Sequence, residues 1–211
     1  MTAFEVLREF FKGRATIGDE EFALMQRTLT PRLLKAGDFL LRAGDVATHA
    51  AFIAHGCLRS YTVDQKGKEH IVSFAPETYW LADAASWTTR SPSQYFFQAI
   101  EDSEILLLDG PGHDRLLADV PGYAASFQTG LQKHAAAKDR RIVSAMSASA
   151  EERYLEFLKT YPSIVTRVPQ WMLASYLGIS PETLSRIRKN LSRPKRRRRG
   201  AALPRDENQT R

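Results

Sequence analysis

Apolar residues recur at helical spacing near the N-terminus and then give way to short alternating runs. Phe4, Leu7 and Phe11 lie three or four residues apart, which predicts one or two helices over residues 1–30. Between residues 31 and 110, short apolar runs alternate with glycine-containing turn signals. Short strands spaced by about 8–12 residues are typical of an antiparallel sandwich or barrel. We therefore expect an eight-strand double-sheet jelly roll.

A long amphipathic helix is predicted over residues 123–146, after a short helical connection over residues 111–122. A capping-box pattern at residues 149–152 then opens another helix, which Pro162 ends. The long helix either packs on its own sandwich alone or also pairs with a second copy. We expect the pairing, with Phe127, Leu131, His134 and Lys138 on the dimer helix. The full stripe is Tyr123, Phe127, Leu131, His134, Lys138 and Ile142.

Residues 170–191 have the spacing of a helix-turn-helix. Ala174 is small enough to let two helices cross closely, and Gly178 can adopt a left-handed turn conformation. Leu184 and Ile187 lie three residues apart, so both can seat the second helix on the first. An ordinary helical hairpin that touches no nucleic acid is the alternative interpretation.

The second helix carries its own start signals. Ser180 can cap it, and Pro181 suits its first position. We expect Leu184, Ile187 and Leu191 to turn inward, which leaves a polar outward face.

That outward face predicts contacts with the major groove of DNA. Arg186 can donate hydrogen bonds to guanine, and Glu182 can accept a hydrogen bond from cytosine. Lys189 can pair with phosphate groups. The expected DNA-binding residues are Gln170, Ser180, Pro181, Glu182, Thr183, Ser185, Arg186, Arg188 and Lys189.

Positive charge is concentrated beside this segment. Nine basic residues and no acidic residue lie between Arg186 and Arg199, so the remainder of the chain accounts for −3 of the net +6 charge. A mildly acidic body with a basic end suggests that this end meets a polyanion. We expect residues 195–211 to be a basic, disordered tail. A solvated tail without a partner is the alternative.

Composition argues against membrane-spanning, secreted and disulfide-bonded proteins. The chain is 43% hydrophobic and 26% charged, as in ordinary globular proteins. No apolar run approaches the roughly 18 residues of a membrane span, and the N-terminal residues lack the order of a signal peptide. Cys57 is the single cysteine, so an intramolecular disulfide is excluded and a reducing cytoplasm is expected.

The chain resembles the cyclic-AMP receptor protein / fumarate-nitrate regulator (CRP/FNR) superfamily. Residues 178–187, Gly-Ile-Ser-Pro-Glu-Thr-Leu-Ser-Arg-Ile, are similar to the family's G-x-S-R-E-T-V-x-R-x, and residues 56–59 are similar to its G-x-v-r turn and strand. The resemblance implies a sensory β-roll, a long dimerisation helix and a winged helix-turn-helix. It also implies a homodimeric bacterial transcription regulator that reads bases with Glu182 and Arg186, with RNA polymerase as a candidate partner. Pro181 replaces the family's first arginine.

The sensory half departs from the cyclic-nucleotide binders of that family. Alignment on residues 99–102 places Asp83 at the position of the family's glutamate, and Ser93 and Gln94 where arginine and serine or threonine stand. Serine has no positive charge and cannot make the two-point contact by which arginine binds a cyclic phosphate. We therefore expect neither cyclic AMP nor an iron–sulfur cluster, because a cysteine cluster is also missing. Trp80, Asp83, Ser93 and Gln94 form a candidate effector pocket.

Two other functional classes remain open. A cupin-like metal enzyme would use the same jelly roll, but the five histidines form no His-x-His pair, so we expect neither catalysis nor a metal. A ligand-sensing module without DNA binding is the second alternative. We divide the chain into a sensory domain (1–115), a linker and dimerisation helix (116–147), a helix-turn-helix domain (148–194) and the tail (195–211).

Overall fold

The computed structural model describes residues 1–192. The predicted tail at 195–211, and the last residues of the predicted DNA-binding domain, lie outside the described residues. The N-terminal segment forms two helices, α1 (Ala3–Phe11) and α2 (Asp19–Thr28), as the spacing predicted. The Thr2 side chain accepts a hydrogen bond from the Glu5 N–H and so opens α1 with a capping box.

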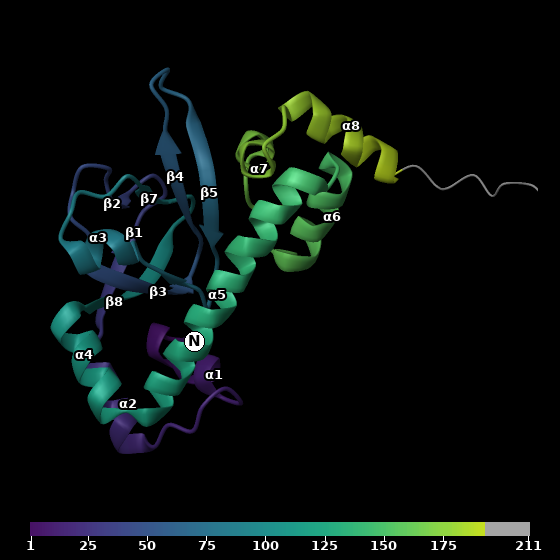
Figure 1. The fold of residues 1–211 in the computed structure, drawn as a ribbon. Coiled ribbons are helices and arrows are strands. Elements are labelled where there is room, and N and C mark those ends of the chain that lie inside the picture. The colour runs from purple at the N-terminus through teal and green to yellow at the C-terminus, as the bar shows by residue number, and fades with distance from the viewer. Residues whose placement is uncertain (193–211) are drawn as a thin grey trace, which may run out of the picture.

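An eight-stranded antiparallel sandwich follows, which confirms the predicted jelly roll. One sheet has the order β1-β8-β3-β6 and the other β2-β7-β4-β5 (Figure 1). A short helix, α3 (Ala84–Thr89), lies between β6 and β7. The strands are β1 (Thr30–Leu34), β2 (Phe39–Leu41), β3 (His49–His55), β4 (Leu58–Val63), β5 (Glu69–Ala75), β6 (Trp80–Leu81), β7 (Phe96–Ala99) and β8 (Ser103–Asp109).

Helices make up the rest of the described chain. The 27-residue α5 leads from the N-terminal helices to the last three helices, of which α7 lies beside β5 (Figure 1). No strand follows β8 within residues 1–192, so the described part lacks strands that would form the wing implied by the resemblance. The helices are α4 (Gly110–Asp119), α5 (Pro121–Ser147), α6 (Ala150–Thr160), α7 (Gln170–Leu177) and α8 (Pro181–Ser192).

Three apolar clusters hold these layers together. Ile53 and Ile105 lie between the two sheets. On the outer face of the first sheet, Phe52 packs with residues of α1, α2 and α4. On the outer face of the second sheet, Ile71 and Phe74 share one core with α6, α7 and α8. We call α6, α7, α8 and their connections the DNA-binding unit, and its packing on the second sheet joins it to the sandwich.

Candidate nucleic-acid interface

The turn between α7 and α8 has the geometry of a helix-turn-helix. Gly178 adopts a left-handed conformation with φ 66° and ψ 36°, a conformation in which a side chain costs energy. Its N–H donates to the Ser175 carbonyl, and the Ile179 N–H donates to the Ala174 carbonyl. Ala174 and Leu184 are almost fully buried where the two helices meet. The predicted turn and helix crossing are therefore confirmed.

Ser180 caps α8, as predicted. Its Oγ accepts a hydrogen bond from the Thr183 N–H at 3.2 Å and donates to the Thr183 Oγ1 at 3.2 Å. Both hydroxyls are thus engaged within the cap and fix the first turn of α8. Pro181 follows at the first helical position, where its missing N–H costs nothing.

The outward face of α8 forms an open concave surface. Its lining residues are Pro181, Glu182, Ser185, Arg186 and Lys189. The Glu182 backbone N–H lowers the pKa of the exposed Glu182 carboxyl, so it is an anionic acceptor at neutral pH. A donor and an acceptor for base edges therefore lie on one exposed helix face, four residues apart.

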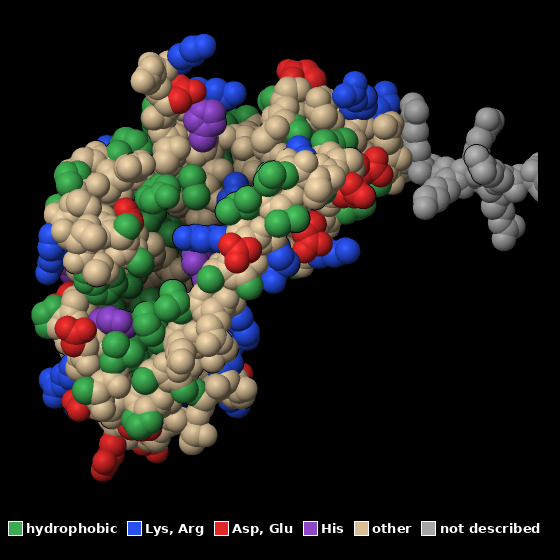
Figure 2. Space-filling view, in the orientation of Figure 1, with side chains coloured by type: hydrophobic (Ala, Val, Ile, Leu, Met, Phe, Trp, Pro, Cys, Tyr) green, Lys and Arg blue, Asp and Glu red, His purple; other side chains and the backbone are tan. Residues whose placement is uncertain are grey.

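One residue of α8 was predicted wrongly. Leu191, expected to turn inward, is 40% exposed. It lies a turn beyond Ile187, past the core that α8 shares with α6 and α7, so no apolar neighbour covers it fully. Gln170 opens α7, and Arg188 lies on α8; both are exposed. Lys and Arg side chains gather near the far end of α8 (Figure 2).

The long helix α5 leaves most of its surface uncovered. Every residue from 127 to 140 is exposed, including His134 and Lys138 of the predicted dimer stripe. Leu131 is 58% exposed and Ile142 60% exposed, and hydrophobic side chains are visible along α5 (Figure 2). Phe127 is 42% exposed and meets only His113 and Tyr123 among aromatic rings of the described residues. An apolar stripe on a long exposed helix is typical of a helix that pairs with a partner.

The candidate effector residues are only partly brought together. Asp83 accepts hydrogen bonds from the Ser93 hydroxyl at 2.7 Å and from the Ser86 N–H at 3.2 Å. Asp83 and Ser93 are both buried. Gln94, by contrast, is exposed. Trp80 lies with the cluster on the outer face of the first sheet, 5.4 Å from the Phe52 ring, so it does not join Asp83.

Cys57 is buried, and burial raises the pKa of its thiol to about 12. A buried cysteine that stays protonated behaves as a small apolar residue. Among the described residues, no group of three or more His, Cys, Asp or Glu side chains could hold a metal ion. Within the same residues, no helix is long and apolar enough to cross a membrane.

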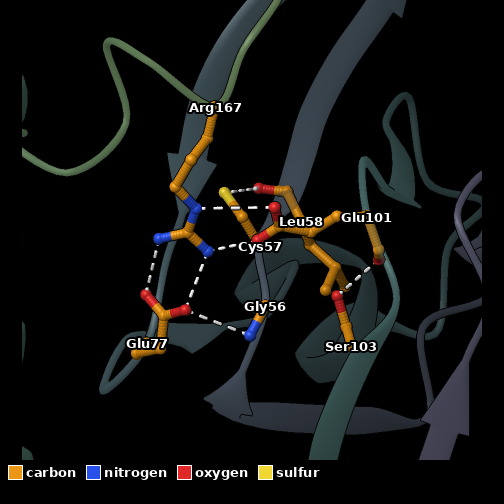
Figure 3. A network of polar contacts seen from close by, with 7 residues as sticks. All are labelled: Gly56, Cys57, Leu58, Glu77, Glu101, Ser103 and Arg167. Carbon is orange, nitrogen blue, oxygen red and sulfur yellow. Dashed lines mark hydrogen bonds and ion pairs between the residues drawn. The ribbon is translucent and has the colours of Figure 1, made fainter.

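A polar cluster that the sequence did not predict connects the DNA-binding unit to the sandwich (Figure 3). Arg167, in the connection between α6 and α7, donates to both carboxylate oxygens of Glu77 at 2.9 and 2.7 Å. It also contacts the carboxylate of Glu101. We call these three residues the Arg167 cluster. Their sequence separations are 90 and 66 residues, so only the tertiary structure brings them together.

Comparison with known protein families assigns the sandwich. The model of the cyclic nucleotide-binding domain matches residues 31–119, which hold all the strands except the first residue of β1, together with α3 and α4.

Relatives match along most of the chain. The chain is 25% identical over 185 residues to a probable transcriptional regulator, flp, of Lacticaseibacillus casei, covering 85% of this chain and 84% of the relative. It is 23% identical to the fumarate and nitrate reduction regulatory protein of Vibrio cholerae, covering 73% of this chain and 65% of that relative's length. The named relatives are regulators and not enzymes.

Solved structures agree in fold. The c-di-GMP responsive global regulator CLP of Xanthomonas campestris superposes with a TM-score of 0.66 at 14% identity, over 82% of this chain and 91% of that one. FixK2 of Bradyrhizobium japonicum gives a TM-score of 0.64 at 18% identity, over 77% of this chain and 84% of that one. The sandwich, the long helix, the helix-turn-helix and the named relatives lead to one conclusion. The sandwich is a cyclic nucleotide-binding domain, and most of the chain is similar to transcription regulators of the CRP/FNR type.

Proposed function

We propose that this chain binds operator DNA as a homodimer, with α8 in the major groove. The observation that carries the proposal is the open outward face of α8, where Glu182, Ser185 and Arg186 are exposed while the opposite face is buried. In this docking, Arg186 donates to guanine O6 and N7, and Glu182 accepts from cytosine N4. The engaged hydroxyls of Ser180 and Thr183 act by fixing the helix start.

Phosphate contacts would set the docking register. Lys189 lies on the concave face and Arg188 beside it, and Gln170 stands at the N-terminus of α7, where backbone N–H groups favour phosphate oxygens. These contacts strengthen binding to all DNA sequences, since phosphates carry no base information.

The homodimer would form along α5. Family members bind DNA as dimers, and the stripe of Phe127, Leu131 and Ile142 on an otherwise uncovered helix offers a self-complementary surface. A twofold axis along paired helices presents two copies of α8 to two half-sites. RNA polymerase is a candidate partner of the DNA-bound dimer, and the cytoplasm is the compartment in which these partners meet.

The sandwich would serve as a sensor that does not take cyclic AMP. The Asp83 carboxylate and the Ser93 hydroxyl satisfy each other where the family's cyclic-nucleotide binders hold a phosphate. Ser93 supplies no cation to pair with a phosphate there. The chain's one cysteine is buried, which argues against an iron–sulfur cluster, and we expect no cofactor.

Selection of bound sequences from a random DNA library tests the proposal. A bound motif with twofold symmetry, whose half-sites lie about one helical turn or a multiple of it apart, is the expected result. Recovery of no preferred sequence at any salt concentration would contradict it and favour a sensing module that does not bind DNA.

A further inference from the structure

The DNA-binding unit is built into the same core as the second sheet. Ile71 and Phe74 of β5 pack with Phe157 of α6 and Leu173 of α7. The ring centroids of Phe74 and Phe157 are 6.1 Å apart. An apolar core of this kind resists sliding, because its side chains interdigitate. The orientation of α7 and α8 relative to the sandwich is therefore defined by contacts.

Polar contacts at the edge of the sheet fix the same orientation. β5 is one of the two edge strands of the second sheet, so its outward backbone groups lack a neighbouring strand. The Ile71 N–H donates to the Ser175 Oγ of α7 at 3.0 Å, and this hydroxyl donates to the Glu69 carbonyl at 3.2 Å. Arg141 of α5 donates to the carbonyl of Val72 and, at 3.2 Å, to that of Tyr176 in α7. Directional bonds of this kind hold α7 in one register on the strand.

The Arg167 cluster forms a third attachment, at the end of the sandwich. Glu77 lies in the turn between β5 and β6, and Glu101 in the turn between β7 and β8. Two carboxylates share one guanidinium there (Figure 3). Without Arg167 the two anions would face each other without a counter-ion, and like charges at short distance repel.

The Glu77 carboxylate is also held by the sandwich itself. The Gly56 N–H donates to the Glu77 Oε1 at 3.1 Å. Gly56 has φ 90°, and a Cβ there would lie 2.3 Å from the Ser103 Oγ and 2.7 Å from the Asp102 carbonyl oxygen. Only glycine fits this turn, so the sandwich presents Glu77 in a fixed position.

Arg167 lies three residues before Gln170, the first residue of α7. A contact that fixes Arg167 therefore fixes the start of the helix pair. The outward face of α8 stays exposed in this arrangement, so docking orients the recognition surface and leaves it uncovered.

We propose that Arg167 is a positioning residue, which orients α8 for operator DNA by binding Glu77 and Glu101 of the sandwich. The inference rests on the proposed function, since it concerns how that function is tuned. Two copies of α8 must contact two half-sites at once. A DNA-binding unit that moves freely relative to its sandwich would therefore rarely have the geometry needed for binding. Apparent affinity falls in proportion to the competent fraction.

The first test compares Arg167→Gln with Lys159→Gln. Lys159 is exposed on α6 and has no ion-pair partner among the described residues, so its variant removes the same charge from the same unit. We expect Arg167→Gln to weaken binding to the selected operator by about tenfold, while binding to random DNA matches that of Lys159→Gln. The measurement is fluorescence anisotropy with both DNA probes, on full-length chains.

A charge exchange separates positioning from simple loss of a cation. Arg167→Glu alone should bind the operator weakly, as should Glu101→Arg alone. The double variant again holds one guanidinium between two carboxylates, and we expect it to regain most of the operator affinity. Unchanged weak binding in the double variant would count against the cluster as an orienting contact.

Hydrogen exchange reports the docking directly. The Ile71 amide is protected by Ser175 of the DNA-binding unit, so its exchange should accelerate in Arg167→Gln and remain slow in Lys159→Gln. If Arg167→Gln binds the operator with the same affinity as Lys159→Gln, the inference is overturned. Tighter operator binding by Arg167→Gln would also overturn it, because the docked arrangement would then inhibit. A wild-type chain that prefers no DNA sequence would instead contradict the proposed function, so the two failures are distinguishable.

Discussion

The Ser93 hydroxyl donates to the Asp83 Oδ2 at 2.7 Å, ten residues away along the chain and within the buried interior. The Ser86 N–H satisfies the other carboxylate oxygen, Oδ1, at 3.2 Å. The loop that carries α3 is thus closed by its own side chains. A phosphate entering here would have to displace a carboxylate that is already hydrogen-bonded.

Cyclic nucleotides should therefore not bind at micromolar concentration. Isothermal titration with cyclic AMP and cyclic GMP should give no heat beyond dilution, and neither nucleotide should change operator affinity. Saturable micromolar binding of either one would contradict this reading of Asp83 and Ser93.

Ser93→Ala should destabilise the fold by about 1–3 kcal/mol, because it leaves one oxygen of the buried Asp83 carboxylate without its donor. Denaturant unfolding monitored by circular dichroism measures this free energy. The exposed neighbour Gln94 supplies the control, and Gln94→Ala should leave the unfolding midpoint close to that of the wild type. Equal midpoints for the two variants would show that the Ser93–Asp83 bond contributes little.

Arg186→Ala should weaken binding to the selected operator by about 1–3 kcal/mol and relax base preference at one position of each half-site. Lys189→Ala is the matched variant, since it removes one charge from the same concave face. It should weaken operator and random DNA alike, with the preferred sequence unchanged. An Arg186→Ala chain that keeps both affinity and preference would refute the proposed docking of α8.

Leu131→Glu should convert the dimer to monomers at concentrations where the wild type is dimeric. A charge in an apolar helix interface is costly, whereas Leu131 is 58% exposed within one protomer, so the monomer should still fold. Gln132→Glu adds the same charge one position along the exposed helix and should leave the dimer intact. Sedimentation equilibrium distinguishes the two variants, and a dimeric Leu131→Glu chain would exclude α5 as the interface.

Acid should loosen the contact between Glu77 and Arg167. Partial burial acts to raise the pKa of Glu77. The hydrogen bonds from Arg167 and from backbone N–H groups, together with the positive charge of Arg167, outweigh burial, and the pKa lies below the usual 4.5. A carboxyl whose pKa is lowered by folding stabilises the fold at pH values above its pKa in the unfolded chain. This contribution is lost as the pH falls through the pKa of the folded state. Glu101 and Arg167 are the charged side chains facing it.

Glu77→Gln should accordingly reduce the unfolding free energy at neutral pH and flatten its decrease toward acid. Denaturant unfolding at a series of pH values provides the comparison, with Glu151→Gln as an exposed control on α6. Parallel pH curves for the wild type and Glu77→Gln would mean that Arg167 does not stabilise the ionised carboxyl.

Local patterns were sufficient to predict the helix-turn-helix. Gly178, Ser180 and Pro181 each favour a particular backbone conformation within a few residues, so they predict the turn without knowledge of the tertiary structure. The same holds for the capping box at Ser149 and Glu152, which the structure confirms.

Features that depend on distant partners leave little signal in the local sequence. β1 contains Pro31 and lies at a sheet edge, where proline is tolerated although it weakens a strand pattern. β6 has only two residues, too few for any alternation. Arg167 is one basic residue in a turn-rich segment, and its partners lie 90 and 66 residues away. Nothing in its local sequence distinguishes it from a solvated arginine.

The edge of β5 affects how readily the protein aggregates when the DNA-binding unit separates from the sandwich. Ser175 and Arg141 occupy backbone groups that would otherwise be free to pair with another strand. A protomer whose DNA-binding unit has lifted away presents an open strand edge next to the uncovered Ile71 and Phe74. Exposed apolar edges recruit further chains by strand addition. We therefore expect the helix-turn-helix also to protect the sandwich from aggregation, and variants that loosen it to be lost from solution before they unfold.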